Sequence, residues 1–268
     1  MSLPNVVGKD RFASVYSAEH FVRELRQSNW DPGPLPDAVI FTYAGFELLF
    51  AAQPDDYAMN PMLGTGPGRF FLVNSTEGRV GVSCMGIGAP AVVAQLEILA
   101  ALGVRRFLSL GTAGGLGRDQ TPGDVIVLSG AIRDEGTSYH YVGLDDDAVP
   151  DAELTHDLAA AIANTGIAST TGRTWTIDAP FRQTAEEITE FRRQGVLAVE
   201  MEASALFAVA SARGLKVASA VVLDSVYGDP IGPPRMDTAT AFGKLYDLFL
   251  VGVAALARRS GDSGEGGA

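Results

Sequence analysis

The sequence is poor in cysteine and in histidine. Among its 268 residues it contains one cysteine, Cys84, and three histidines. A single cysteine excludes an intramolecular disulfide and is compatible with a reducing compartment. His20, His140 and His156 do not show the spacing of metal ligands, so the sequence predicts no metal site.

Positive charge is also scarce. The chain has 20 lysines and arginines against 32 aspartates and glutamates, which gives a formal net charge of −12. Proteins that hold nucleic acid without regard to its sequence neutralise phosphates with lysine and arginine, so nucleic acid is not an expected partner. The negative field also repels anions, so an anionic substrate requires a locally basic pocket.

Long apolar runs are missing as well. The first twenty residues contain no apolar signal-peptide core, and no uninterrupted apolar run reaches the roughly 20 residues that span a bilayer. We therefore expect a cytoplasmic protein with no membrane partner. Because 47% of the residues are hydrophobic, the chain can bury a large core. We expect one domain over residues 1–258, with a helical extension at 1–37, and a disordered glycine-rich tail at 259–268.

Hydrophobic periodicity predicts strands that alternate with helices. Strands are expected at residues 38–43, 69–74, 79–84, 106–110, 124–128, 196–199 and 215–223. Helices are expected at residues 17–29, 91–102, 151–165, 184–194, 203–210 and 238–258. Residues 75–78 are typical of a hairpin turn, and Ser17 is the expected cap of the first helix. This order predicts an α/β fold with a mainly parallel sheet covered on both faces.

Polar residues follow several of these strands at their carboxyl ends, where ligands bind in open α/β sheets. They are Thr112 and Gly114 after 106–110, Arg133 and His140 in the loop after 124–128, Glu200, Met201 and Glu202 after 196–199, and Asp224 and Ser225 after 215–223. We expect these residues to meet at one edge of the sheet and to form a site.

Glu200 and Glu202 lie inside an otherwise apolar run, and a buried carboxylate requires a polar partner. One of the two glutamates is equally explained as a cap of the following helix, where negative charge is favourable. Met201 is also compatible with a core position. Asp224 is also compatible with a role in capping a turn.

Four motifs together resemble the nucleoside phosphorylase family, which includes uridine phosphorylase and the hexameric purine nucleoside phosphorylases. They are Gly86-Ile87-Gly88-Ala89-Pro90, Gly111-Thr112-Ala113-Gly114-Gly115-Leu116, Gly123-Asp124-Val125-Ile126 and Val199-Glu200-Met201-Glu202-Ala203. The resemblance extends over about residues 79–225. It implies a three-layer α/β/α fold with a central mixed, mainly parallel twisted sheet.

The resemblance also implies roles for individual residues. Glu200, Met201 and Glu202 would form the ribose-binding signature, in which Glu202 would bind the ribose hydroxyls and Met201 would pack beneath the sugar. Thr112 and Gly114 would line the junction of the sugar and the nucleophile. Phe181 falls near the segment that covers the base. Asp224 matches the aspartate of purine-type enzymes that protonates the leaving base, whereas the uracil-reading Gln-x-Arg insertion is not evident after Phe181.

The sequence departs from the family pattern at the phosphate site. The family's Gly-Asp-Pro-x-Arg loop corresponds here to residues 41–47, which contain no arginine, and Ser109 stands where the family has another arginine. Arginine suits phosphate because its fork donates two aligned hydrogen bonds. Arg133 and Arg182 are the candidate substitutes, although Arg133 is equally compatible with a salt bridge to Asp134 or Glu135.

The family likeness predicts phosphorolysis of a nucleoside to a free base and ribose 1-phosphate, with a purine nucleoside or uridine as substrate. Inorganic phosphate would be the co-substrate, and no cofactor is expected. A hydrolytic nucleosidase and a nucleoside-binding protein without turnover remain the alternatives. The family also implies a homo-oligomer, a dimer or a hexamer, in which a neighbouring subunit completes the site, and His20 is a candidate for such a donated residue.

Overall fold

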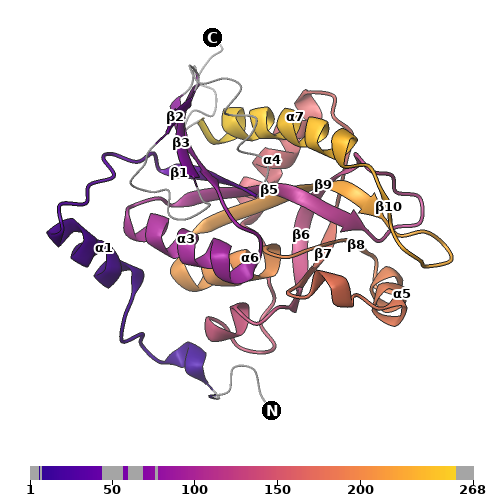
Figure 1. The fold of residues 1–268 in the computed structure, drawn as a ribbon, viewed down its shortest axis with the longest axis horizontal. Helices are drawn as coiled ribbons and strands as arrows, with labels where there is room; N and C mark the ends of the chain where they lie inside the picture. Colours follow the sequence, from indigo (N-terminus) through magenta and orange to yellow (C-terminus); the bar gives the residue numbers. More distant parts are fainter. Residues whose placement is uncertain (1–5, 7, 44–56, 60–68, 76–77, 258–268) are drawn as a thin grey trace, which may run out of the picture.

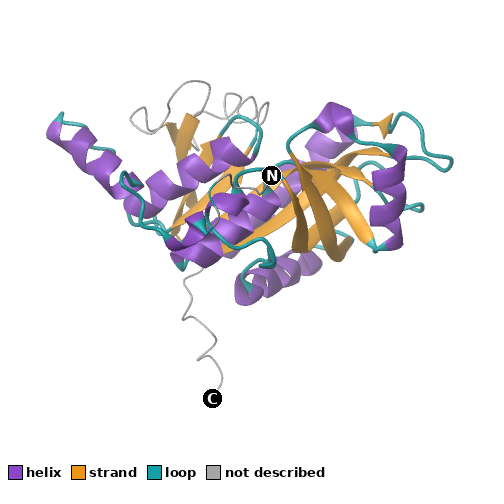
Figure 2. Ribbon diagram, turned by 90° about the horizontal axis from the view of Figure 1, so that it is seen from below, coloured by secondary structure: helices purple, strands orange, loops and turns teal. Residues whose placement is uncertain are grey.

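Among the described residues, ten strands form one mixed sheet that runs through the molecule, with helices on both of its sides (Figures 1 and 2). The computed structural model describes residues 6, 8–43, 57–59, 69–75 and 78–257. The strands are β1 (Ala38–Thr42), β2 (Tyr57–Met59), β3 (Arg69–Ser75), β4 (Gly78–Cys84), β5 (Arg106–Gly115), β6 (Val125–Asp134), β7 (Ser169–Ile177), β8 (Val196–Glu200), β9 (Lys216–Val226) and β10 (Arg235–Met236). The expected tail at 259–268 and part of the expected 41–47 segment lie outside the described residues.

The expected mixed, mainly parallel character of the sheet is confirmed. The two longest ladders, β5 with β9 and β6 with β7, are parallel. Strand β1 is parallel to β4 and β5, and β7 is parallel to β8. The antiparallel pairs include β3 with β4, the strands that were expected to form a hairpin.

Five of the strands close into a ring. Strand β5 pairs with β9 and with β8, β9 also pairs with β6, and β7 joins β6 to β8. Because β5 also pairs with β1, it belongs both to the ring and to the open part of the sheet. Strand β5 therefore connects the strands that carry the candidate site residues.

Strands of the open sheet are buried on both faces. In β1, Val39 and Phe41 belong to one hydrophobic cluster, and Ala38 and Ile40 belong to the other. The first cluster includes residues of α3 (Ala89–Ala101) and α6 (Ala203–Arg213), and the second includes residues of α4 (Ala152–Asn164) and α7 (Thr238–Ala257). This alternation produces the two helical layers and confirms the expected three-layer arrangement.

Helix α7 is, within the described residues, the one helix long and apolar enough to cross a membrane by length and composition alone. Its residues Leu245, Leu248 and Phe249 are buried in the second cluster, and it contacts β1, β4, β5 and β9. These contacts identify α7 as a core helix that covers one face of the sheet.

Several strands differ from the sequence prediction, and the short strands β2 and β10 were not expected. The Gly111–Gly115 segment was expected as a break, but it continues β5, because its backbone pairs with β9 and β8. Strand β6 extends to Asp134, so Arg133 lies in a strand rather than in a loop. Strand β7 was not predicted at all, because its first half is exposed and polar and only its second half is apolar enough to be buried.

The helices agree more closely with the sequence prediction. Helix α1 (Ala18–Gln27) begins after Ser17, whose hydroxyl accepts a hydrogen bond from the His20 amide as the expected N-cap. Helix α5 (Ala185–Arg193) begins with a capping box formed by Thr184 and Glu187.

Candidate active site

A cavity of about 480 Å³ is lined by residues of β5, β8 and β9 and by Tyr43, which follows β1. Eight of the residues predicted from the sequence line it together: Thr112, Gly114, Phe181, Glu200, Met201, Glu202, Asp224 and Ser225. The expectation that the strands bring these residues to one place therefore agrees with the structure. Strand β8 is antiparallel to β5, so the residues meet through the closed ring and not at a simple common edge of parallel strands.

Glu200 is the helix-capping acid of the pair. One of its carboxylate oxygens accepts hydrogen bonds of 2.7 Å from the backbone amides of Glu202 and Ala203, at the start of α6. The other oxygen accepts from the hydroxyls of Thr176 and Thr174, at 2.5 and 3.4 Å. The alternative of a capping role is thus correct for Glu200, whose carboxylate is directed into the protein framework.

Glu202 is held differently, by two backbone amides at the cavity wall. Its Oε1 accepts a 2.6 Å hydrogen bond from the amide of Gly88, and its Oε2 accepts a 3.2 Å bond from the amide of Met201. Gly88 is the N-cap of α3 and has φ 107°, a conformation that favours glycine. Each carboxylate oxygen keeps a lone pair that can accept from a ligand hydroxyl.

The two buried acids perturb each other. Burial and the charge of Glu200 beside it together raise the pKa of Glu202 to about 8, against the hydrogen bonds from Gly88 and Met201. Burial also raises the pKa of Glu200, and four hydrogen-bond donors oppose that rise. Because Glu200 has the stronger set of donors, the negative charge of the pair belongs on Glu200 and the shared proton on Glu202.

Asp224 occupies a β-bulge. In the ladder between β5 and β9, Ala113 pairs with Leu223 and Gly114 pairs with Ser225, which leaves Asp224 as the extra residue. A bulge turns a side chain out of the regular alternation and is frequent next to active sites. This irregularity explains how Asp224 reaches the cavity from the interior of a strand and not from a turn.

The cavity also includes residues that the sequence did not single out, among them Tyr43, Gln183, Tyr227 and Met236. The hydroxyl of Tyr43 lies 2.7 Å from that of Ser109, and the hydroxyl of Tyr227 donates to Gln183 at 2.5 Å. Ile87, from the first of the four motifs, lines the cavity as well. The position of Tyr43, at the end of a predicted strand, was the signal that could have identified it.

Arg133 does not line this cavity. Its Nε donates to Ser138 at 2.9 Å, its Nη1 donates to the carbonyl oxygens of Gly143 and Asp146, and its guanidinium lies over the ring of Tyr139. The alternative salt bridge with Asp134 or Glu135 is not formed either. Arg133 instead fixes the chain that follows β6.

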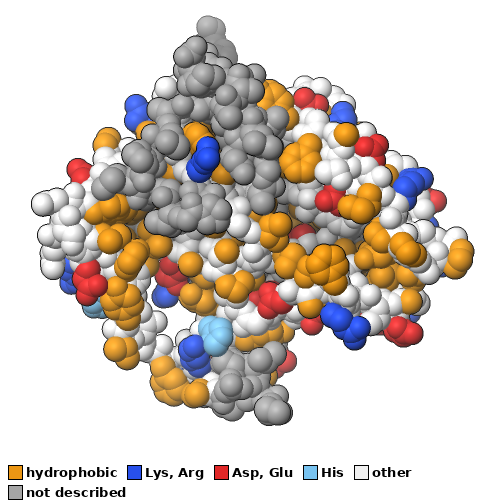
Figure 3. Space-filling model, viewed as in Figure 1, with side chains coloured by type: hydrophobic (Ala, Val, Ile, Leu, Met, Phe, Trp, Pro, Cys, Tyr) orange, Lys and Arg blue, Asp and Glu red, His pale blue; other side chains and the backbone are white. Residues whose placement is uncertain are grey.

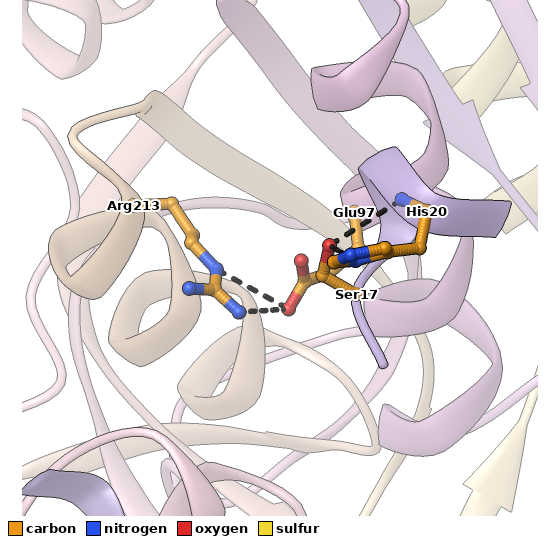
Figure 4. Close-up of polar contacts among 4 residues, drawn as sticks. All are labelled: Ser17, His20, Glu97 and Arg213. Carbon is orange, nitrogen blue, oxygen red and sulfur yellow. Dashed lines mark hydrogen bonds and ion pairs between the residues drawn. The ribbon is translucent and has the colours of Figure 1, made fainter. Parts of the chain in front are cut away.

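His20 does not line this cavity either. Its ring contacts the hydroxyl of Ser17 at 2.9 Å, close to the ion pair that joins Arg213 of α6 to Glu97 of α3 (Figure 4). Ser17, Glu97 and Arg213 line a second cavity, of about 640 Å³, beneath the N-terminal segment. His140, which the sequence placed among the residues of the candidate site, lines this second cavity instead.

No lysine, arginine or histidine occurs among the described residues that line the 480 Å³ cavity. On the face shown in Figure 3, basic side chains are isolated and form no patch. Among the described residues, no group of three or more histidine, cysteine or acidic side chains is placed to hold a metal ion. The acidic side chains among the described residues that line the cavity are Glu200, Glu202 and Asp224.

The structure is that of an α/β protein in which two buried glutamates and a bulged aspartate line one cavity. Comparison with known families assigns the chain to one of them. The model of the phosphorylase superfamily matches residues 39–246, so this chain belongs to that superfamily. The resemblance inferred from the sequence motifs is confirmed.

Individual relatives are nucleoside phosphorylases. Over 139 residues the chain is 34% identical to a guanosine phosphorylase of Halorubrum lacusprofundi, which covers 52% of this chain and 58% of the relative. A uridine phosphorylase of Escherichia coli is 30% identical over 155 residues, covering 52% and 61%. A uridine phosphorylase of Thermococcus kodakarensis is 32% identical over 209 residues, covering 65% and 76%. The match thus spans about three fifths of the first two relatives.

Solved structures share the fold. A purine nucleoside phosphorylase of Toxoplasma gondii, crystallised with immucillin-H, superposes with a TM-score of 0.73 at 20% identity and covers 83% of this chain and 91% of its own. A uridine phosphorylase of Vibrio fischeri gives a TM-score of 0.70 at 23% identity, covering 85% and 93%.

Proposed function

We propose that this protein is a nucleoside phosphorylase, which cleaves the N-glycosidic bond of a nucleoside with phosphate and releases a free base and a pentose 1-phosphate. The observation that carries the proposal is the placement of Glu202 and Asp224 at one cavity, just after β8 and within β9, the strands that pair with β5. The names of the relatives support phosphorolysis over hydrolysis.

Glu202 has the properties of a sugar-binding acid. Its two backbone donors fix the carboxyl group and leave acceptor capacity for the ribose 2′- and 3′-hydroxyls. Hydrogen bonds to sugar hydroxyls strengthen as the sugar ring gains positive character in the transition state. Met201 lines the same wall and provides an apolar surface beneath the sugar.

Asp224 is placed to act on the base. A proton donor at the base nitrogen lowers the cost of expelling an anionic leaving group. Phe181 is 98% exposed at the mouth of the cavity, and its ring offers a face on which the base can stack. Thr112 and Gly114 lie on β5 between the sugar-binding acid and the base-binding acid.

Hydrolysis is the second candidate, because the described lining of the cavity offers no basic side chain to phosphate. The two reactions differ in their products. We expect purified protein to release base from guanosine, inosine or uridine only when phosphate is present, with pentose 1-phosphate as the second product by chromatography. Free pentose formed at a rate independent of phosphate would identify a nucleosidase instead. Bound nucleoside without any product would identify a binding protein.

We further propose that phosphate is the co-substrate and that no other cofactor takes part. We also infer a cytoplasmic homo-oligomer, a dimer or a hexamer, by analogy with the superfamily to which the chain belongs. Light scattering coupled to gel filtration measures the oligomer directly. A monomer that is fully active would contradict this part of the proposal.

A further inference from the structure

Tyr43 and Ser109 form a hydroxyl pair at one end of the active-site cavity. Their oxygens lie 2.7 Å apart, and either oxygen can be the donor. The ring of Tyr43 packs directly on Gly111, where an added Cβ would approach it to 2.8 Å. Ser109 is buried in β5, and the half-buried Tyr43 lines the cavity. The ring is thus fixed by close packing, with its hydroxyl held at a defined place.

Tyr43 and Asp224 lie on opposite sides of β5, the strand to which Ser109 belongs. Phe41, two residues before Tyr43, pairs with Ser109 in the ladder of β1 with β5, whereas Asp224 belongs to β9, on the other side of β5. Thr112 lies on β5 between them and also lines the cavity. A nucleophile that displaces the base must approach the sugar from the side away from the base. If Asp224 meets the base, Tyr43 is on the side of the nucleophile.

Positive charge is not available there from the chain around Tyr43. The sequence contains no lysine or arginine between Arg26 and Arg69, so the segment after β1 cannot supply a guanidinium. Burial, together with the negative charge of the nearby Glu200–Glu202 pair, raises the pKa of Tyr43 well above its usual value, so its phenol keeps its proton. It therefore remains a hydrogen-bond donor over the whole physiological range of pH.

We propose that Tyr43, Ser109 and Thr112 form the subsite for the attacking phosphate and bind it through neutral hydroxyl donors. The proposal rests on the phosphorylase function proposed above. One hydroxyl of the Tyr43–Ser109 pair donates to the other, which leaves one proton for a phosphate oxygen, and Thr112 supplies a second donor. In the reaction a phosphate oxygen bonds to C1′ as the C1′–N bond breaks, and the electron pair goes to the base nitrogen, which is protonated by way of Asp224. The hydroxyl pair transfers no proton.

The test measures phosphate binding separately from turnover. Inorganic phosphate is titrated into the full-length protein without nucleoside by calorimetry or ³¹P NMR, for wild type, Tyr43→Phe and Ser109→Ala. A hydrogen bond to a charged group contributes about 1.5–3 kcal/mol, so each substitution should weaken phosphate binding about 10- to 100-fold. Because the two hydroxyls act as a unit, the double variant should lose little more than either single one. Tyr139→Phe removes a tyrosine hydroxyl outside the cavity and should leave the phosphate affinity unchanged.

Steady-state kinetics distinguish this proposal from the proposed function. The KM for phosphate should rise in Tyr43→Phe and Ser109→Ala while the KM for the nucleoside stays within about twofold, as expected for loss of a positioning contact. Wild-type protein that binds no phosphate, or binding that is equal in all variants, would overturn the subsite. Phosphate binding that depends on Tyr43, without release of base from any nucleoside, would overturn the phosphorylase function alone.

Discussion

The carboxylate of Glu200 accepts a 2.7 Å hydrogen bond from the backbone amide of Glu202, so one buried acid fixes the backbone that carries the other. The two side chains then point to different partners. Glu200 is directed to Thr176 and the start of α6, and Glu202 to Gly88 at the start of α3. Glu200 thus has a structural role, we propose a ligand-binding role for Glu202, and substitutions should separate the two.

Glu202→Ala should abolish cleavage and leave the protein folded. The substitution removes the acceptor for the sugar hydroxyls and also removes a carboxyl group whose burial is costly. We expect kcat/KM to fall by at least about 10²–10³-fold, as when a positioned transition-state contact is lost. Glu186→Ala, on the exposed face of α5, is the matched control and should keep full activity. Near-normal turnover of Glu202→Ala with every nucleoside would contradict the assignment.

Glu200→Ala should instead damage the fold. It leaves the hydroxyl of Thr176 and the amides of Glu202 and Ala203 without their acceptor inside the protein. We expect the free energy of unfolding to fall by about 2–4 kcal/mol, more than in Glu202→Ala. Urea denaturation, monitored by circular dichroism, measures the free energy of unfolding of both variants. An equal or smaller loss in Glu200→Ala would show that the capping contacts contribute little.

Stability of the ligand-free protein should fall as pH rises from about 5 to about 8. Glu202 has a pKa of about 8 in the folded protein, above its usual value of 4.5. Between these values the folded state holds a proton that the unfolded state has released, and stability therefore decreases with pH and levels off above 8. Glu202→Gln should remove this part of the slope. The measurement is Tm at several pH values, and parallel curves for the two proteins would contradict the shift.

Asp224→Asn should impair purine nucleosides more than uridine. A purine gains from protonation at a ring nitrogen, whereas a uracil anion is already delocalised over two carbonyl groups. We expect purine cleavage to fall by about 10²–10⁴-fold, the usual range for a general acid. The comparison is kcat/KM for inosine or guanosine against uridine. A loss of equal size for both bases would show that Asp224 serves another purpose.

Much of the active site was predictable because its residues follow buried strands. Glu200, Glu202 and Asp224 stand at or near the ends of apolar runs, which the sequence displays directly. Arg133 could not be placed in this way. The sequence did not reveal that β6 continues to Asp134 or that it pairs antiparallel with β9, and both features take Arg133 away from the cavity.

The glycines of β5 led to a similar error. The local preference of glycine for turns predicts that the strand ends at Gly111 and Gly114. Contacts with residues far away in the sequence instead allow β5 to continue. Gly111 admits the ring of Tyr43 and Gly114 admits Val199, so these glycines allow close packing across a continuous strand. The partner of each glycine lies far away in the sequence, and no local pattern indicates it.

The closed ring of β5, β9, β6, β7 and β8 also determines what can vary in this molecule. Glu202 follows β8 and Asp224 lies in β9, and both strands are hydrogen-bonded to β5. The backbone hydrogen bonds between these strands therefore fix the spacing between the two acids. Loops and outward-facing side chains can change without altering that spacing. A strand of the ring cannot shift its register in one ladder without breaking another ladder. The distance between Glu202 and Asp224 therefore stays constant. The residues at the mouth of the cavity, which we expect to determine substrate preference, can change without affecting that distance.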